Sequence, residues 1–309
     1  MNVKNEISNY DGNRNENIAE LSAIMRNSAK INDNEIEIIT ENSKVAKRVF
    51  LLLKDIYNVT ANICDRNNAF NRNRLFVVTI DSKVDDILMD LAVNDDKGNY
   101  LSVVSSYLID SEEEKRAYLK GLFLSCGSVN DPKTSRYHLE FFVNEYEEAL
   151  FVSDLLNEFN LNSKVLKKDK KYMIYIKEAE KIGDFLRIIN APQAVMYYED
   201  IRIYRDHKNM TNRLNNMEQA NIEKTIMTCN EQIDDINLII NKLGMDFLDE
   251  KVQEAIKYRL KYPESSLQEL SDIMSYEIDK PITKSGLNHR FRKIKEIANK
   301  IRENIIQDE

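Results

Sequence analysis

The residues best suited to chemistry lie near the C-terminus, in the segment TKSGLNHRFRKIKEIANKIR (283–302). From Lys280 to Arg302 the sequence contains eight basic residues and one acid, Glu296, whereas the preceding stretch 246–279 contains nine acids and four bases. The charge therefore changes sign between these two stretches. The segment 280–302 has a local positive charge, although the whole chain has a net charge of -8. The chemistry that this segment offers is contact with an anionic partner through lysine and arginine.

Helical periodicity divides this segment into two faces of different chemistry, at about 100° per residue. The apolar face, which we expect to be buried, consists of Leu287, Phe291, Ile294 and Ile297. The opposite face consists of Ser285, Asn288, His289 and Arg292. Asparagine can bridge adenine N6 and N7, and arginine can bridge guanine O6 and N7, in the major groove of DNA. The polar face therefore suits the reading of base edges.

These two properties make the segment a candidate for contact with double-stranded DNA. We expect the contacts to come from Lys284, Ser285, Asn288, His289, Arg290, Arg292, Lys293 and Lys295. The structural alternative is a solvated basic face on a surface helix. The shared outward direction of serine, asparagine, histidine and arginine favours DNA contact over that alternative.

The positioning elements predicted for this face are two shorter helices that precede it. LDEKVQEAIKYRLKYPE (248–264) and SLQELSDIM (266–274) have helical spacing, and a turn with Pro281 separates them from 283–302. Three helices in this order, with the last one basic, predict a helix-turn-helix domain over residues 243–309.

A second basic cluster lies on a predicted strand pair, SKVL (163–166) and YMIYI (172–176). Its candidate DNA-binding residues are Lys164, Lys167, Lys168, Lys170 and Lys171. A two-stranded ribbon can enter a major groove, and Arg66, Arg72 and Arg74 occupy the equivalent hairpin earlier in the chain. A lysine-rich turn that keeps a sheet edge soluble is the alternative.

The equivalence of the two hairpins follows from an internal duplication. YLKGLFLSCGSV (118–129) is an apolar helix-like run, and LSAIMRNSA (21–29) matches it with Ala23 and Ala29 in place of Gly121 and Gly127, at an offset of 98. Both glycines allow the close approach of another backbone. The two helices are therefore expected to pack against each other.

The elements that follow each of these helices repeat in the same order: strand, helix, two strands and helix. Asn42 and Asn144, which are 102 positions apart, are predicted to cap the second helix of each copy. The predicted fold is α+β, with a duplicated domain at residues 1–190 made of repeats at about 15–92 and 111–190. Pro192 ends this pattern, and residues 191–242 have only helical signals, so a helical linker is expected to join this domain to the helix-turn-helix domain.

Composition limits the class of protein. The chain has 309 residues, of which 42% are hydrophobic and 31% charged, so it is long enough for two or three globular domains. Three distant cysteines suggest neither a disulfide framework nor a zinc cluster. With no apolar leader and no run of eighteen apolar residues, we expect a cytoplasmic, nucleoid-associated protein that does not enter a membrane. No cofactor, metal or small-molecule substrate is predicted.

The paired helices 21–29 and 118–129 resemble the two LAGLIDADG helices of homing endonucleases. Together with NRLNNMEQANIEKT (212–225), YPESSLQEL and TKSGLNHRFRKI, the duplicated domain resembles the WhiA family over nearly the whole chain. This resemblance implies a bacterial DNA-binding regulator linked to sporulation and cell division, with a degenerate LAGLIDADG domain that cleaves no DNA.

The residues at the ends of the paired helices agree with a loss of cleavage. Homing endonucleases carry a metal-binding carboxylate immediately before the terminal glycine of each helix, where this sequence has Ser28 and Cys126. Asp33 and Asp131 lie beyond the helix ends. We expect a sequence-specific transcription regulator that is not an enzyme. The alternative is a protein-interaction scaffold in cell division or chromosome organisation that contacts other division or transcription proteins and binds DNA only secondarily.

Overall fold

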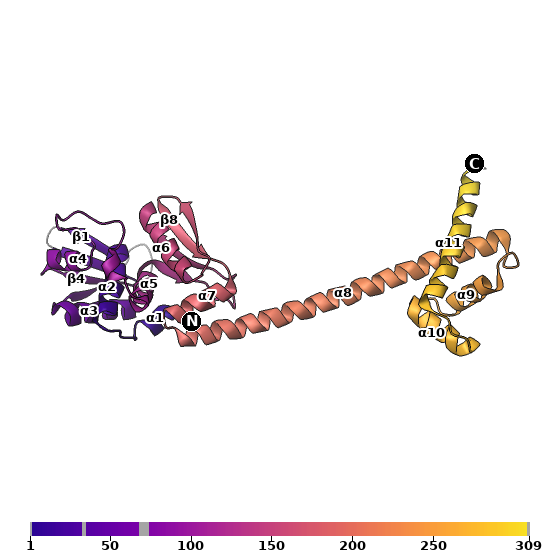
Figure 1. Ribbon diagram of the computed structural model, residues 1–309, viewed down its shortest axis with the longest axis horizontal. Helices are drawn as coiled ribbons and strands as arrows, with labels where there is room; N and C mark the ends of the chain where they lie inside the picture. Colours follow the sequence, from indigo (N-terminus) through magenta and orange to yellow (C-terminus); the bar gives the residue numbers. More distant parts are fainter. Residues whose placement is uncertain (1, 33–34, 68–73, 308–309) are drawn as a thin grey trace. The chain divides into compact units, whose positions relative to one another are not determined.

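The computed structural model describes residues 2–32, 35–67 and 74–307 (Figure 1). The chain divides into two compact units, residues 1–206 and 207–309. The first unit is α+β and the second is entirely helical in the residues described. This division of secondary structure confirms the predicted fold class.

The first unit contains the predicted duplication, preceded by a short helix, α1 (Val3–Ile7). The first copy consists of α2 (Arg14–Ser28), β1 (Ala29–Asn32), β2 (Glu35–Thr40), α3 (Ser43–Tyr57), β3 (Asn62–Asn67), β4 (Arg74–Ile80) and α4 (Val84–Asp90). The second copy consists of α5 (Glu112–Cys126), β5 (Gly127–Val129), β6 (Leu139–Val143), α6 (Tyr146–Glu158), β7 (Lys164–Lys168), β8 (Lys171–Ile176) and α7 (Ala179–Ile188). A single 3₁₀ turn at Ser106–Leu108 lies between the copies.

Each copy forms an antiparallel four-stranded sheet, and the strand orders are equivalent: β1-β2-β4-β3 and β5-β6-β8-β7. The predicted element order lacked the first strand of each sheet, because residues 118–129 were assigned to one helix. In the structure α5 ends at Cys126, and Gly127–Val129 pairs with β6. Strands of three and four residues that follow a helix directly leave too few alternating positions for a sequence pattern to separate them.

Helices α2 and α5 pack side by side at the centre of the unit (Figure 1). At Gly121, an added Cβ would lie 2.2 Å from the backbone oxygen of Glu20 and 3.0 Å from the Cβ of Ala23. Only glycine allows this approach of two backbones, which confirms the predicted pairing. The core around the pair includes Leu21, Ile24, Leu122 and Phe123, which are buried.

Of the two predicted N-cap residues, one in each copy, only the first caps its helix. Asn42 caps α3 as expected, and its Oδ1 accepts hydrogen bonds from the amides of Lys44 at 2.8 Å and Val45 at 3.4 Å. The prediction for Asn144 is wrong, because Glu145 is the N-cap residue of α6 and makes no side-chain cap hydrogen bond. An identical residue at an equivalent position therefore does not ensure an identical cap.

Both ends of α8 (Pro192–Leu243) pack into a hydrophobic core. At its start, Ala194 and Tyr198 are buried in the core of the first unit. Near its end, Ile236 and Ile239 are buried in the core of the second unit, which therefore includes residues that the sequence assigned to the linker. Gly244, at φ 78°, follows the helix end.

The second unit continues with α9 (Glu250–Lys261), α10 (Leu267–Ile278) and α11 (Lys284–Gln307), which match the three predicted helices. Their buried residues, including Ile256, Leu270, Met274 and Leu287, form one hydrophobic core. Across the part of the chain that the structure describes, no helix is long and apolar enough to cross a membrane.

Candidate nucleic-acid interface

Helix α11 buries the face that periodicity predicted. Leu287, Phe291 and Ile294 are buried, and Ile297 is half-buried against the same core. Ala298 is also buried, one turn beyond Ile294, and was not predicted. The polar side of α11 is consequently directed away from α9 and α10.

The turn before α11 is held by specific hydrogen bonds. Asp279 ends α10 in the left-handed conformation, at φ 51°. Ser275 Oγ then accepts a hydrogen bond from the Ile282 amide at 2.9 Å, and Thr283 Oγ1 accepts one from the Gly286 amide at 3.1 Å, as an N-cap does. These contacts fix the direction in which the first turns of α11 leave the domain.

Arg259 is a structural residue of this unit that the sequence pattern did not single out. Its side chain is fully buried. The guanidinium donates to Gln232 Oε1 at 3.0 Å and to the Ser265 carbonyl at 2.5 Å, and it lies 5.3 Å from the Phe291 ring centre. It therefore connects α8, α9, the start of α10 and α11. An arginine between Lys257 and Lys261 gives no signal of such burial in the sequence.

The predicted base-reading residues share one accessible face in the first two turns of α11. Lys284, Ser285, His289 and Arg292 are exposed, and Asn288 is half-buried. Within the described residues, neither Lys284 nor Arg292 has an ion-pair partner, whereas four other bases of α11 do. The charges on this face are free for an external anion.

Four other bases of α11 are neutralised within the unit, which sequence reasoning did not foresee. Their ion pairs are Arg290 with Glu254 at 3.3 Å, Lys293 with Asp249, Lys295 with Glu231 at 3.3 Å, and Arg302 with Asp235 at 2.6 Å. Lys293 holds the pKa of Asp249 below its usual range through their hydrogen bond. Acids of α8 and of the stretch 246–279 thus neutralise four bases of α11, while Lys284 and Arg292 keep no ion-pair partner among the described residues.

The lysine-rich strand pair has an outer face that combines positive charge with aromatic rings. Because Lys164 pairs with Tyr175, and Lys168 with Lys171, these side chains lie on one face of the second sheet. Lys168 Nζ lies 5.2 Å from the ring centre of Phe142, which is on the same face. The opposite face carries the buried core of the sheet.

The remaining two predicted lysines of this hairpin point elsewhere. Lys167 alternates to the other face, where its Nζ lies 6.0 Å from the ring centre of Tyr172, and Lys170 occupies the two-residue loop after Asp169. Both are exposed. No acid within the described residues forms an ion pair with any of the five predicted lysines.

The equivalent hairpin of the first sheet has a different charge balance. Arg66 pairs with Glu37 at 3.0 Å, and Arg74 pairs with Asp65 at 3.8 Å. Arg72 lies outside the described residues. The two sheets are therefore related in fold but not in surface charge, and the second one has the more positive outer face.

The last residues of α2 and α5 occupy the positions at which homing endonucleases carry metal-binding carboxylates, and neither residue is a carboxylate. Ser28 and Cys126 are the last residues of these helices, and burial raises the pKa of the Cys126 thiol to about 12. Asp131 accepts a hydrogen bond from the Tyr197 hydroxyl at 3.0 Å, and Asp33 lies outside the described residues. Among the described residues, no three His, Cys, Asp or Glu side chains come together as a group that could hold a metal ion.

One buried carboxyl group close to these helix ends was missed by the sequence analysis. Glu148, on α6, is 2% exposed and accepts a hydrogen bond from Asn27 Nδ2 at 3.0 Å. Burial raises its pKa to about 7, although Asn27 and the charge of Arg26 oppose this shift. Since Asn27 belongs to the first copy and Glu148 to the second, this contact connects the two repeats.

Family models match three successive parts of the chain. They are described as the WhiA N-terminal LAGLIDADG-like domain (14–93), the WhiA LAGLIDADG-like domain (115–208) and the WhiA C-terminal HTH domain (211–298). The last model begins within α8, in agreement with the burial of the end of that helix in the second unit.

Relatives match over almost the full length. A probable cell division protein WhiA from Bacillus cytotoxicus is 42% identical over 92% of this chain and 90% of its own. A protein of the same name from Lactobacillus acidophilus is 39% identical over 97% of this chain and 98% of its own. The crystal structure of full-length DUF199/WhiA from Thermatoga maritima is similar in fold, with a TM-score of 0.58, 24% identity and 96% of each chain covered. The chain therefore belongs to the WhiA family.

Proposed function

We propose that this protein is a sequence-specific DNA-binding transcription regulator that acts in cell division or sporulation. The observation that carries the proposal is the free polar face at the start of α11. There Asn288 and Arg292 are accessible on the third helix of a helix-turn-helix, next to Ser285 and His289. An arginine without an internal partner can form a bidentate contact with guanine, and asparagine can do so with adenine.

The paired bases of α11 have a different role in this proposal. Arg290 is 17% exposed and bound to Glu254, so it supports the domain rather than reading bases. Lys293 and Lys295 are about half exposed and can exchange their acidic partners for phosphates. Base contacts are thereby limited to about two turns of the helix, the length that enters a major groove.

The outer face of the second sheet supplies a further DNA contact. Lys164, Lys168 and Lys171 would contact phosphates there, since no acid neutralises them among the described residues. Such contacts increase affinity for all sequences, whereas the α11 face supplies the preference. Association with the nucleoid in the cytoplasm would follow from this binding.

The name of the relatives supports the link with cell division, because both Bacillus cytotoxicus and Lactobacillus acidophilus proteins are named as probable cell division proteins. We further propose that the duplicated domain has no nuclease activity. Ser28 and Cys126 provide no anionic oxygen where the paired helices end, and a hard divalent cation prefers such oxygens.

The test is to recover the genomic DNA fragments that the full-length protein binds and to sequence them. The wild-type protein should enrich fragments that share a short motif. The double variant Asn288→Ala, Arg292→Ala should still bind DNA but enrich no motif, whereas the control Glu180→Ala, on exposed α7 surface, should behave like the wild type. A wild-type protein that enriches no motif and instead forms a stable protein complex without DNA would favour the interaction-scaffold function.

A further inference from the structure

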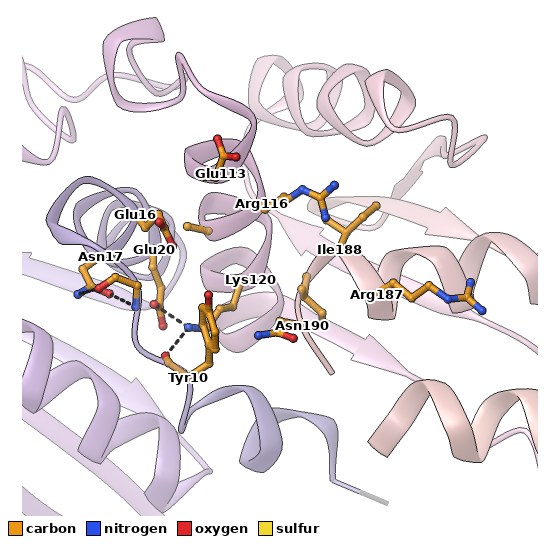
Figure 2. Close-up of a pocket in the computed structure, with 13 residues that line it drawn as sticks. Tyr10, Glu16, Asn17, Glu20, Glu113, Arg116, Lys120, Arg187, Ile188 and Asn190 are labelled. Atoms are coloured by element: carbon orange, nitrogen blue, oxygen red, sulfur yellow. Dashed lines mark hydrogen bonds and ion pairs between the residues drawn. The ribbon is translucent and has the colours of Figure 1, made fainter. Parts of the chain in front are cut away.

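The charges buried beside α2 and α5, at a cavity of about 270 Å³, are paired within the protein (Figure 2). The Lys120 ammonium donates to the Tyr10 carbonyl at 2.9 Å and to Glu20 Oε2 at 3.0 Å. Glu20 also binds the buried Arg48, at 2.7 Å to Nη2, and Arg48 pairs with Asp11 as well. These contacts connect α2, α3 and α5, so the charges stabilise the packing of the domain. The lysines on the outer face of the second sheet differ, because none of them has an ion-pair partner among the described residues.

The outer face of the second sheet carries two aromatic rings on its two central strands. Phe142 lies on β6 and Tyr175 on β8, and both side chains are half-buried. Because Phe142 pairs with Met173, two residues before Tyr175, the two rings belong to diagonal neighbours, which are about 7–8 Å apart in antiparallel sheets. Leu166 is 51% exposed and adds apolar surface on the same face. This face therefore combines aromatic and apolar groups with lysines.

The fold does not require aromatic residues at these two positions. Since the two sheets have equivalent registers, Phe142 corresponds to Ile39 of the first sheet, and Tyr175 corresponds to Thr79. Neither residue of the first sheet is aromatic, although the strand order is the same. The rings are thus a feature of the second sheet alone, which is also the sheet with the more positive outer face.

Lysine ammonium groups lie over both rings. Lys168 Nζ is 5.2 Å from the ring centre of Phe142, and Lys177 Nζ is 4.7 Å from that of Tyr175. Both lysines are exposed, so their ammonium groups can move from the ring to a phosphate. A base stacked on an aromatic ring contributes more to binding free energy than a solvated ammonium over the same ring. Bases and phosphates of a bound strand can therefore replace these cation–π contacts together.

Negative charge on this face is limited to one residue. Among the described residues at the outward positions of the paired strands, Glu140 is the only acid. Its Oε2 lies 3.1 Å from His138 Nε2, and the His138 ring stacks on Tyr175 with ring centres 5.9 Å apart. The acid is thus held beside a third ring, and the lysines set the charge of the face.

We propose that the outer face of the second sheet binds single-stranded nucleic acid, with unpaired bases stacked on Phe142 and Tyr175. The phosphates of the strand lie at Lys164, Lys168 and Lys171. In a duplex both faces of a base are covered by neighbouring base pairs, so only an unpaired base can stack on these rings. A four-stranded sheet whose aromatic residues stack two or three bases is also the binding surface of RNA-recognition modules. The lysines contact phosphates of either form, whereas the rings add affinity only for unpaired bases. This binding is additional to the reading of duplex DNA by α11 and does not depend on it.

Fluorescence anisotropy of the full-length protein measures this binding, with a labelled oligothymidylate of about 12 nucleotides as the probe. An oligouridylate and a random duplex of the same length are the comparisons, and the tighter of the two single strands identifies DNA or RNA as the preferred form. Phe142→Leu and Tyr175→Leu should each weaken single-strand binding by about 5- to 100-fold, the effect of one lost stacked base. Duplex affinity should change by less than about 2-fold, because the lysines remain.

The matched control is Tyr146→Leu. Tyr146 is 52% exposed and lies against Tyr172, with ring centres 5.2 Å apart. Tyr172 pairs with Lys167, which alternates away from the outer face, so this substitution removes an aromatic ring elsewhere on the same sheet. Tyr146→Leu should bind single strands and duplex as the wild type does.

A further variant gives a signal that does not depend on the folding of the leucine variants. The chain has no tryptophan, so Tyr175→Trp introduces a single fluorescent indole on the outer face. The indole can still stack on a base, so this variant should bind oligothymidylate about as tightly as the wild type. Its fluorescence should be quenched by the single strand and not by the duplex.

The proposal is wrong if the wild type binds neither single strand, or if bound oligothymidylate leaves the fluorescence of Tyr175→Trp unchanged. It is also wrong if both leucine variants keep wild-type affinity, or if they lose affinity for single strands and duplex alike. None of these results bears on motif enrichment through α11, which tests the proposed function separately.

Discussion

Arg290 and Arg292 lie two positions apart on α11 and have different electrostatic surroundings. Arg290 donates to the Lys251 carbonyl at 3.0 Å and pairs with Glu254, whereas Arg292 has no partner in the described part of the unit. The difference depends on residues almost forty positions earlier, so a local sequence pattern cannot reveal it. The density of basic residues in the sequence identified α11 as the candidate DNA-binding helix. Tertiary contacts determine which of its basic side chains have an ion-pair partner within the protein.

These surroundings predict opposite phenotypes for two matched substitutions. Arg292→Ala should cost about 1–3 kcal/mol of binding free energy on the preferred site and little on random DNA, because a bidentate base contact is lost. Arg290→Ala should instead lower the free energy of unfolding by about 1 kcal/mol and retain sequence preference. Fluorescence anisotropy with both DNAs, together with urea unfolding, separates the two effects. Equal binding losses on specific and random DNA for Arg292→Ala would mean that α11 contacts only the backbone.

Glu148 predicts a pH-dependent contribution to stability. Its folded-state pKa is raised from 4.5 to about 7, so between these values the folded protein holds a proton that the unfolded chain has lost. The contribution of this group to the free energy of unfolding therefore falls as pH rises from about 4.5, and the loss is complete above about 7. Glu148→Gln cannot ionise and keeps an oxygen for Asn27, so it should gain on the wild type over this range by about 3 kcal/mol at most.

Urea unfolding of both proteins at several pH values measures this difference. The control is Glu180→Gln, which removes a carboxylate from the exposed surface of α7 and should show no such trend with pH. A stability difference between wild type and Glu148→Gln that is constant from pH 4.5 to 7.5 would contradict a raised pKa.

At the scale of elements, the α2–α5 pair determines how the two repeats meet. Gly121→Ala should lower the free energy of unfolding by about 1–3 kcal/mol, because its Cβ would meet the Glu20 backbone oxygen. This loss should exceed the gain of about 1 kcal/mol in helix propensity. Gly286→Ala on α11 is a suitable comparison, since its nearest contact is a side-chain oxygen at 3.3 Å. If Gly121→Ala had the same free energy of unfolding as the wild type, α2 and α5 could move apart at no cost in stability, which would contradict the prediction.

The same helix pair predicts the absence of metal-dependent cleavage. The wild-type protein should cut no DNA with magnesium or manganese, because neither helix end carries a carboxylate. The substitutions Ser28→Asp and Cys126→Asp would place carboxylates at the two helix ends. Supercoiled plasmid relaxation, assayed by gel electrophoresis, measures this directly. Specific double-strand cleavage by the wild type that Asp131→Ala removes would overturn the prediction.

Element type and order could largely be predicted from periodicity in this chain, since every helix and strand of the duplicated domain corresponds to a predicted segment except α1, the 3₁₀ turn at Ser106–Leu108, β1 and β5. The duplication itself predicted the contact between α2 and α5. Caps were less predictable, because Asn42 forms its cap and Asn144 does not. The local sequence pattern indicates whether a segment is a helix or a strand. The residues at which the element begins and ends depend on contacts with residues that are distant in sequence.

At the scale of the molecule, the proposed function requires a chain of net charge -8 to bind DNA through local positive surfaces. One such surface lies in each unit: the start of α11, and the outer face of the second sheet with Lys164, Lys168 and Lys171. Because both belong to one chain, binding of one raises the effective concentration of the other near DNA. The two surfaces should therefore contribute to affinity together.

Substitution of these three lysines by alanine in the full chain tests this cooperation. Since each lost phosphate contact reduces the salt dependence of binding by about 0.9, the slope of log K against log salt should become shallower by about 2–3 units. Affinity should fall on all sequences alike, with the preference set by Arg292 retained. The matched control replaces Lys44, Lys47 and Lys54, which are exposed on α3, and changes the net charge equally. If both triple variants had the same slope, net charge alone would explain the effect, and the outer face of the second sheet would only keep a sheet edge solvated.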